Sequence, residues 1–98
     1  MYARVARFEG GDAEGIRRGV AAIKEQGEQG PPEGVPAVGF LLLIDPDAGR
    51  TLAISLYETE ADMRTGDATL NGMSPPPGTL AQRASVEFYE VGAEMRAG

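Results

Sequence analysis

The sequence predicts a small α+β protein in which four strands and two helices follow in the order β-α-β-β-α-β. Three observations predict it. Four short runs have strand-like composition, and two stretches between them repeat apolar residues at helical spacing. Only a short turn, "DPDAG", separates the middle two strands. The chain has 98 residues, so we expect one domain spanning residues 1–98.

The first strand is predicted at Tyr2 to Phe8, where aromatic and β-branched residues alternate with others. Gly10-Gly11 ends this strand, and Asp12 stands where its carboxylate can cap the first turn of a helix. The helix has apolar residues on one face, namely Ala13, Ile16, Val20 and Ile23. The segment Gly27 to Gly34 ("GEQGPPEG") cannot continue a helix and predicts a loop.

A β-hairpin is predicted next, with strands Val38–Ile44 and Thr51–Tyr57 around the turn residues Asp45 to Gly49. If the turn is Pro46 to Gly49, directly opposed residues share a face of the sheet. One face then pairs Leu43 with Leu52, Leu41 with Ile54, and Gly39 with Leu56. The other face pairs Leu42 with Ala53, Phe40 with Ser55, and Val38 with Tyr57.

A second helix begins near Thr59, because Thr59-x-x-Asp62 resembles a capping box. Its candidate core residues are Met63, Leu70 and Met73, and Gly72 with Pro75–Pro77 ends it. Residues Arg83 to Val91 predict the last strand. This order is that of the ferredoxin-like fold, which has a four-stranded antiparallel sheet with two helices on one face.

The strand Val38–Ile44 is apolar on both faces. In an antiparallel sheet with one solvent-exposed face, apolar and polar residues should alternate along each strand. We expect the helices to cover the face with Leu41, Leu43, Ile54 and Leu56. The face with Val38, Phe40, Leu42 and Ile44 is then open and needs a cover, which a second copy of the chain would supply. The sequence therefore predicts a homodimer through this sheet face, with a monomer as the alternative.

Composition excludes several classes of function. The net charge of −6 disfavours nucleic acid and anionic membranes as partners, because both need a basic surface. The chain has no His and no Cys, so no metal site and no cofactor are expected. It shows no signal segment and no apolar run near the roughly 20 residues that a membrane span needs. The expected location is the cytoplasm.

Three segments carry a resemblance to a known family: "YARVARFEG" (Tyr2 to Gly10), "GFLLLIDPDAGRTLAISLYETEADM" (Gly39 to Met63) and "VEFYEV" (Val86 to Val91). They resemble the dimeric α/β-barrel proteins of the antibiotic-biosynthesis-monooxygenase-like superfamily. The resemblance implies that two sheets close into a barrel, and that a small aromatic or enolisable molecule is oxidised or isomerised without a cofactor. Family members that oxidise aromatic polyketides or degrade haem are associated with Asn, Trp or His at the pocket. This chain has neither Trp nor His, and Asn71 is its only Asn.

Any ligand is expected on the sheet face opposite the helices. Strand parity places eight candidate residues there: Tyr2, Arg4, Phe40, Leu42, Ser55, Tyr57, Glu87 and Tyr89. Asn71 is a ninth candidate, from the second helix, where it could orient a carbonyl or simply cap the helix end.

Each candidate has a chemical role and a structural alternative. Arg4 could bind a carboxylate or enolate, or pair with Glu87 on the neighbouring strand. Glu87 could serve as a base if burial without a partner raises its pKa. Tyr57 and Tyr89 could bond a ligand oxygen or pack at a dimer seam. Two functions therefore stay open: a cofactor-independent oxygenase or isomerase, and a non-catalytic homodimer that binds a small apolar ligand or assists a partner enzyme.

Overall fold

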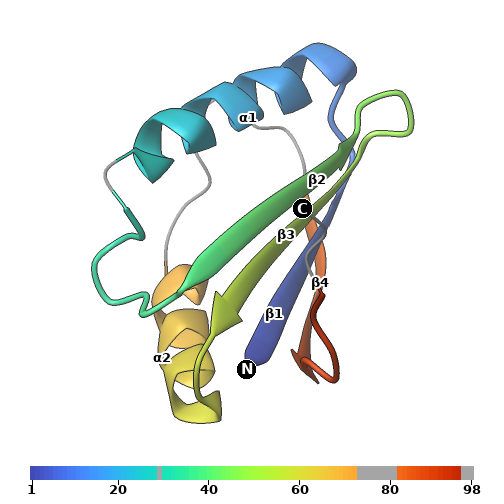
Figure 1. The fold of residues 1–98 in the computed structure, drawn as a ribbon. Coiled ribbons are helices and arrows are strands. Elements are labelled where there is room, and N and C mark those ends of the chain that lie inside the picture. The colour runs from blue at the N-terminus through green and yellow to red at the C-terminus, as the bar shows by residue number, and fades with distance from the viewer. Residues whose placement is uncertain (29, 73–81, 96–98) are drawn as a thin grey trace.

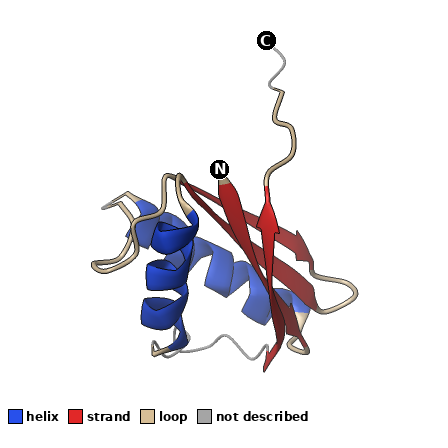
Figure 2. Ribbon diagram, turned by 90° about the horizontal axis from the view of Figure 1, so that it is seen from below, coloured by secondary structure: helices blue, strands red, loops and turns tan. Residues whose placement is uncertain are grey.

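A computed structural model of the chain describes residues 1–28, 30–72 and 82–95. Its elements are β1 (Tyr2–Glu9), α1 (Ala13–Gly27), β2 (Gly39–Asp45), β3 (Arg50–Tyr57), α2 (Glu60–Asn71) and β4 (Gln82–Glu90). The strands form one antiparallel sheet in the order β2-β3-β1-β4 (Figure 1). Both helices lie on the same side of this sheet (Figure 2). The predicted fold class is confirmed.

Both helices begin at the residues that the sequence indicated. The Gly15 backbone N–H donates to Asp12 Oδ1 at 2.6 Å, and the Asp62 N–H donates to Thr59 Oγ1 at 3.1 Å. Each cap thus satisfies one of the N–H groups that a first helical turn leaves free. The residues Met73 and Pro75–Pro77, expected at the end of the second helix, lie outside the described residues.

The hairpin has the predicted turn and register. Asp45 lies opposite Arg50, and the other β2–β3 pairs follow as expected. The Gly49 N–H donates to the Pro46 carbonyl at 3.3 Å, and Gly49 has a φ of +68°. A Cβ at this position would lie 3.0 Å from the Gly11 carbonyl oxygen. Glycine is therefore favoured at position 49 for two reasons: its backbone is in the left-handed region, and the turn packs closely on the residues before α1.

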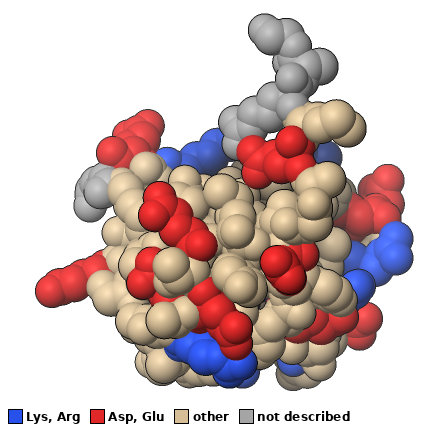
Figure 3. All heavy atoms as spheres, turned by 60° about the horizontal axis from the view of Figure 1, so that its bottom comes forward, with Lys and Arg blue, Asp and Glu red and all other residues tan. Residues whose placement is uncertain are grey.

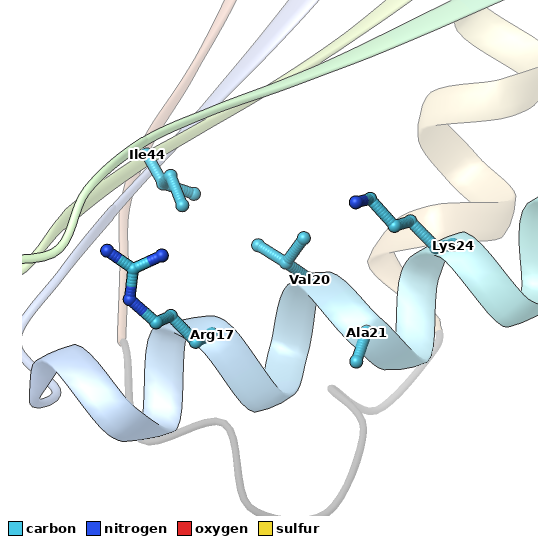
Figure 4. Close-up of a pocket in the computed structure, with 5 residues that line it drawn as sticks. All are labelled: Arg17, Val20, Ala21, Lys24 and Ile44. Atoms are coloured by element: carbon cyan, nitrogen blue, oxygen red, sulfur yellow. The ribbon is translucent and has the colours of Figure 1, made fainter.

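The prediction of which sheet face the helices cover is wrong. Arg4 bonds to Asp67 of α2, Tyr57 packs against Gly66 of α2, and the Ile44 side chain points toward α1 (Figure 4). The helices therefore cover the face of Phe40, Leu42 and Ile44, and the face of Leu41, Leu43, Ile54 and Leu56 is open. The reason is that β2 is apolar on both faces, so hydrophobicity alone does not orient the sheet.

The core lies under α2. It consists of Val35, Tyr57 and Met63, with Tyr2, Ala37 and Leu70 packed around them. Within the described residues, α2 lies close to β1 and β3, whereas α1 approaches no strand as closely. Within α1 only Gly15, Ile16 and Gly19 are buried, and the other residues of its apolar face, Ala13, Val20 and Ile23, are half-buried. The space between α1 and the sheet is thus less completely filled than the space under α2.

The open face of the sheet is apolar. Leu41 is 53% exposed, Leu43 49% and Tyr89 50%. Acidic side chains are spread among uncharged ones on the part of the surface seen in Figure 3, in keeping with the net charge of −6. No helix in the described part of the chain is long and apolar enough to cross a membrane.

Candidate functional site

A buried arginine lies at the centre of the candidate site. Arg4, on β1, is 5% exposed. Its Nε donates to Asp67 Oδ1 at 2.8 Å, and its Nη2 donates to Asn71 Oδ1 at 3.3 Å. Asn71 Oδ1 also accepts a hydrogen bond from Arg83 Nη1. The structure thus brings the predicted residues Arg4 and Asn71 into contact, because the last two turns of α2 lie over Arg4.

Two buried hydroxyls lie beside this arginine on β3. Ser55 is the direct neighbour of Arg4 across the β1–β3 ladder and is 4% exposed, and Tyr57 is fully buried. Neither Ser55 Oγ nor Tyr57 OH has a hydrogen-bond partner among the described residues. Since a buried hydroxyl without a partner costs free energy, such groups are available to a water or a ligand. We call Arg4, Ser55, Tyr57, Asp67 and Asn71 the polar cluster.

Three further predicted residues lie on the same side of the sheet. Tyr2 packs on the core around Tyr57, Leu42 is half-buried, and Phe40, which pairs with Ser55, is 49% exposed. The helix-facing side therefore holds seven of the nine predicted residues: Tyr2, Arg4, Phe40, Leu42, Ser55, Tyr57 and Asn71. The strand residues among them share one face of the sheet, as their alternation predicted. This face is the one that the helices cover, and not the open face.

The remaining two predicted residues, Glu87 and Tyr89, lie on the open face. Arg7 Nε donates to Glu87 Oε1, and Tyr89 OH donates to Glu87 Oε2. The predicted Arg4–Glu87 pair is wrong, because these side chains are on opposite faces. The hydrogen bonds from Tyr89 and Arg7 lower the pKa of Glu87, and the bond to Glu87 raises the pKa of Tyr89. Glu87 is therefore not the base with a raised pKa that the sequence suggested.

Glu87→Gln is expected to change how stability depends on pH. Because the pKa of Glu87 is lower in the folded state, its contribution is present above the unfolded-state pKa and is lost as pH falls through the folded value. The variant should lose less stability than the wild type between neutral and acidic pH. Urea melts at several pH values would show this, with Glu90→Gln as an exposed control on the same strand. If the free energy of unfolding falls equally with decreasing pH in the wild type and in Glu87→Gln, the expectation is contradicted.

Asp67 is a site residue that sequence reasoning missed. It lies four residues after Met63 and four before Asn71, so all three share one face of α2. The signal for it in the sequence was an acidic residue on the same helix face as a core methionine. Such a residue is expected to have a basic partner opposite it.

Asp67→Ala is expected to lower the free energy of unfolding by about 2–3 kcal/mol, since it leaves the Arg4 charge buried without its ionic partner. Glu60→Ala is the matched control, because it removes the exposed Glu60–Arg64 pair on the same helix and should cost about 1 kcal/mol or less. Chemical denaturation measures both. Equal losses would mean that the Arg4–Asp67 pair behaves as an ordinary surface pair.

A second feature of the helix-facing side is a shallow hollow between α1 and β2 (Figure 4). Its volume is about 200 Å³, and it is lined by Arg17, Val20, Ala21 and Lys24 from α1 and by Ile44 from β2. The lining is apolar at the centre and basic at the two ends along α1. We call this feature the α1 hollow.

The residues present do not fit a haem iron or another transition metal. The sequence supplies neither imidazole nor thiolate, which are the usual protein ligands of these metals. Within residues 1–28, 30–72 and 82–95, no group of three or more Asp or Glu is placed to hold a metal ion. The Tyr57 hydroxyl is buried against Gly66, and the Tyr89 hydroxyl is bonded to Glu87. We therefore derive no chemistry through a metal or haem.

Comparison with known proteins shows similarity in structure but not in sequence. No family model matches the chain, and no curated protein sequence matches it. A candidate antibiotic biosynthesis monooxygenase from Deinococcus radiodurans superposes with a TM-score of 0.58 at 14% identity, over 100% of this chain and 99% of that one. A point variant of MhuD with two manganese protoporphyrin IX molecules bound per active site superposes with a TM-score of 0.64 at 16% identity. That match covers 99% of this chain and 100% of the other. The chain therefore has the fold of the antibiotic-biosynthesis-monooxygenase-like proteins.

Proposed function

We propose that residues 1–98 form a single homodimeric domain that binds a small aromatic or enolisable molecule and oxidises or isomerises it without a bound cofactor. The proposal places the ligand on the helix-facing side of the sheet. The observation that supports it most is the buried Arg4 with the partnerless Ser55 hydroxyl beside it. The shared fold with a candidate monooxygenase supports the reaction class.

The polar cluster has the groups that enolate chemistry needs. Arg4 supplies a fixed positive charge and Ser55 a hydrogen-bond donor, which together would stabilise the oxygen of an enolate as it forms. Asp67, 2.8 Å from Arg4 Nε, is the nearest carboxylate and would accept the proton that leaves the substrate carbon. In isomerisation the proton returns to a different carbon. In oxidation, the enolate carbon forms a bond to dioxygen, the resulting hydroperoxide takes up the proton, and loss of water from it leaves a carbonyl group on that carbon.

Arg4 is held less tightly at Nη2 than at Nε. Its bond to Asn71 is 3.3 Å long, against 2.8 Å for its bond to Asp67. We propose that the ligand oxygen replaces Asn71 on Nη2 while Asp67 continues to hold Nε. Asn71 keeps its hydrogen bond from Arg83 in this exchange, so it is not left without a partner.

The dimer in this proposal uses the open face, with its exposed Leu41 and Leu43. Sheet-on-sheet packing of two copies closes both faces into an α/β barrel. Burying even about 300 Å² of apolar surface contributes roughly 7 kcal/mol before the costs of association. A twofold dimer needs only one self-complementary patch, so a single face suffices. In this arrangement the ligand sites stay on the outer, helix-covered sides.

The second candidate function is binding without catalysis, in the cytoplasm as the sequence suggested. The observation that favours it is that Asp67, which is half-buried, already neutralises the charge of the buried Arg4. Such an arrangement could hold a ligand without ionising it.

Oxygen uptake and product formation with a panel of anthrones and dihydroxynaphthalenes would test the proposal. Turnover that falls at least tenfold in Ser55→Ala, but not in the control Ser85→Ala on the open face, supports it. Ligand-induced thermal stabilisation without turnover would establish the binding-only alternative. Neither binding nor turnover with any member of the panel would overturn the proposed ligand class.

A further inference from the structure

We propose that the α1 hollow binds the carboxylate of a small, mainly apolar acid, through Arg17 and Lys24. The inference rests on the proposed function in one respect, the placement of the ligand on the helix-facing side. It adds the chemical class of the ligand, an amphipathic carboxylic acid, which neither the fold nor the polar cluster specifies.

The geometry of the hollow suits such a ligand. Val20 and Ala21 each lie three or four residues from both Arg17 and Lys24, so the four line one side of α1. Figure 4 shows the Arg17 and Lys24 side chains on either side of Val20, with Ile44 of β2 facing them across the hollow. An apolar floor flanked by two cations matches a molecule with an apolar body and one negative group.

The charges of the described residues support an anion. Five arginines pair with a carboxylate of this chain, and Arg83 bonds to Asn71. The paired arginines are Arg4, Arg7, Arg18, Arg50 and Arg64. In the part of the chain that the structure describes, Arg17 and Lys24 have no hydrogen-bond or ion-pair partner. Arg17 and Lys24 thus flank the same apolar hollow, in a chain with a net charge of −6.

The apolar body has a row of side chains to lie on. Leu42 and Phe40 share the helix-facing side of β2 with Ile44, and Phe40 is 49% exposed. From Ile44 to Phe40 is four residues of strand, or about 13 Å. Phe40 pairs with Ser55, so the far end of this row adjoins the polar cluster. An acid of about that length, with its carboxylate at α1, would present its other end to Arg4 and Ser55.

A carboxylate fits the donors better than a phosphate. A phosphomonoester carries about −1.5 to −2 charges and three strong acceptor oxygens. The hollow offers one guanidinium and one ammonium, both from positions beyond the first turn of α1, where backbone N–H groups are already bonded. The Arg17 guanidinium can bond both oxygens of one carboxylate in parallel, and Lys24 adds a second positive charge at the other end of the hollow.

Calorimetric titration with 2-naphthoate, 2-naphthamide and 2-naphthyl phosphate tests the assignment. We expect the carboxylate to bind at least tenfold more tightly than the amide and more tightly than the phosphate. Arg17→Gln and Lys24→Gln should each weaken the carboxylate about threefold, and the double variant about tenfold, since each removes one partly solvated charge contact. Arg18→Gln is the matched control, because Arg18 adjoins Arg17 but pairs with Glu14. It should change the affinity by less than twofold.

Several outcomes would overturn the inference: equal binding of the acid and the amide, equal losses for Arg17→Gln and Arg18→Gln, tighter binding of the phosphate, or no binding of any of them at millimolar concentration. Its failure can be told from failure of the proposed function. If 2-naphthoate binds through Arg17 and Lys24 while no substrate turns over, the acid site stands and catalysis fails. If substrates turn over while 2-naphthoate binds equally to the wild type and to the Arg17→Gln/Lys24→Gln variant, catalysis stands and the acid site fails.

Discussion

Gly66→Ala is expected to destabilise the protein by about 2 kcal/mol or more, with partial unfolding at ambient temperature. A Cβ at position 66 would lie 2.6 Å from Tyr57 Cε1 and 2.7 Å from Cζ. Tyr57 is fully buried between Val35 and Met63, so its ring has little room to move. Overpacking of this kind costs about 1–3 kcal/mol and occasionally more, which exceeds the gain of up to about 1 kcal/mol from replacing a helical glycine.

Two further variants separate the clash from a general effect on the helix. Gly72→Ala places its Cβ 3.6 Å from the Thr69 carbonyl oxygen, which is an ordinary van der Waals contact, so it should leave stability almost unchanged. Tyr57→Leu should partly restore the Gly66→Ala protein, because it removes the ring that the new methyl group meets. Urea unfolding of the wild type, Gly66→Ala, Tyr57→Leu and the double variant gives the coupling energy between positions 57 and 66. A Gly66→Ala protein as stable as the wild type would mean that α2 does not pack on Tyr57 as described.

Leu41→Asp is expected to convert a dimer into a monomer. Leu41 is on the open face and 53% exposed, so a carboxylate there costs little in a monomer. In a sheet-on-sheet dimer the same carboxylate would be buried without a partner, at a cost of several kcal/mol. Sedimentation equilibrium at micromolar concentration should give the wild type a mass near twice 10.3 kDa, and Leu41→Asp a mass near 10.3 kDa.

Phe40→Asp is the matched control for the dimer. Phe40 is the preceding residue, is similarly exposed at 49%, and lies on the opposite, helix-facing side. This variant should keep the dimer mass while losing affinity for any ligand that lies along β2. Loss of the dimer in Phe40→Asp but not in Leu41→Asp would reverse the roles of the two faces, and a monomeric wild type would remove the dimer altogether.

Strand parity and turn chemistry were sufficient to predict the register of the β2–β3 hairpin from sequence, but not that of β1 with β4, where Arg4 lies opposite Phe88 and not Glu87. The turn residues around Gly49 set Asp45 opposite Arg50, and the pairs from Ile44–Thr51 to Gly39–Leu56 then followed. Which face the helices cover depends on different information. Leu41 and Leu42 are equally apolar, so β2 is uninformative, whereas Gly66 and Asp67 of α2 are complementary to Tyr57 and Arg4. That complementarity links residues far apart in the chain, and it shows in a sequence only once the helix face has been assigned.

The candidate site was predicted only in part, because the sequence shows which residues share a face of the sheet but not which face the helices cover. Residues of one parity on paired strands must share a face, so Arg4, Ser55 and Phe40 were grouped correctly even though their face was not. Asp67 was missed because the second helix was interpreted from its apolar core positions and from Asn71, the only Asn of the chain. Arg17 and Lys24 were missed because single basic residues on a helix are usually solvated, and only the structure shows that they flank a hollow.

The central claim is that the two faces of the sheet have different roles, one for a ligand and one for a second copy. The chain carries a natural reporter on each face: Ile44 on the helix-facing side and Ile54 on the open one. Methyl-resolved NMR of the isoleucine-labelled wild type, titrated with 2-naphthoate, tests the claim most directly. We predict that the Ile44 methyl signals shift with saturation while those of Ile54 stay in place. Saturable shifts at Ile54 with none at Ile44 would contradict the account, because they would put the ligand on the open face.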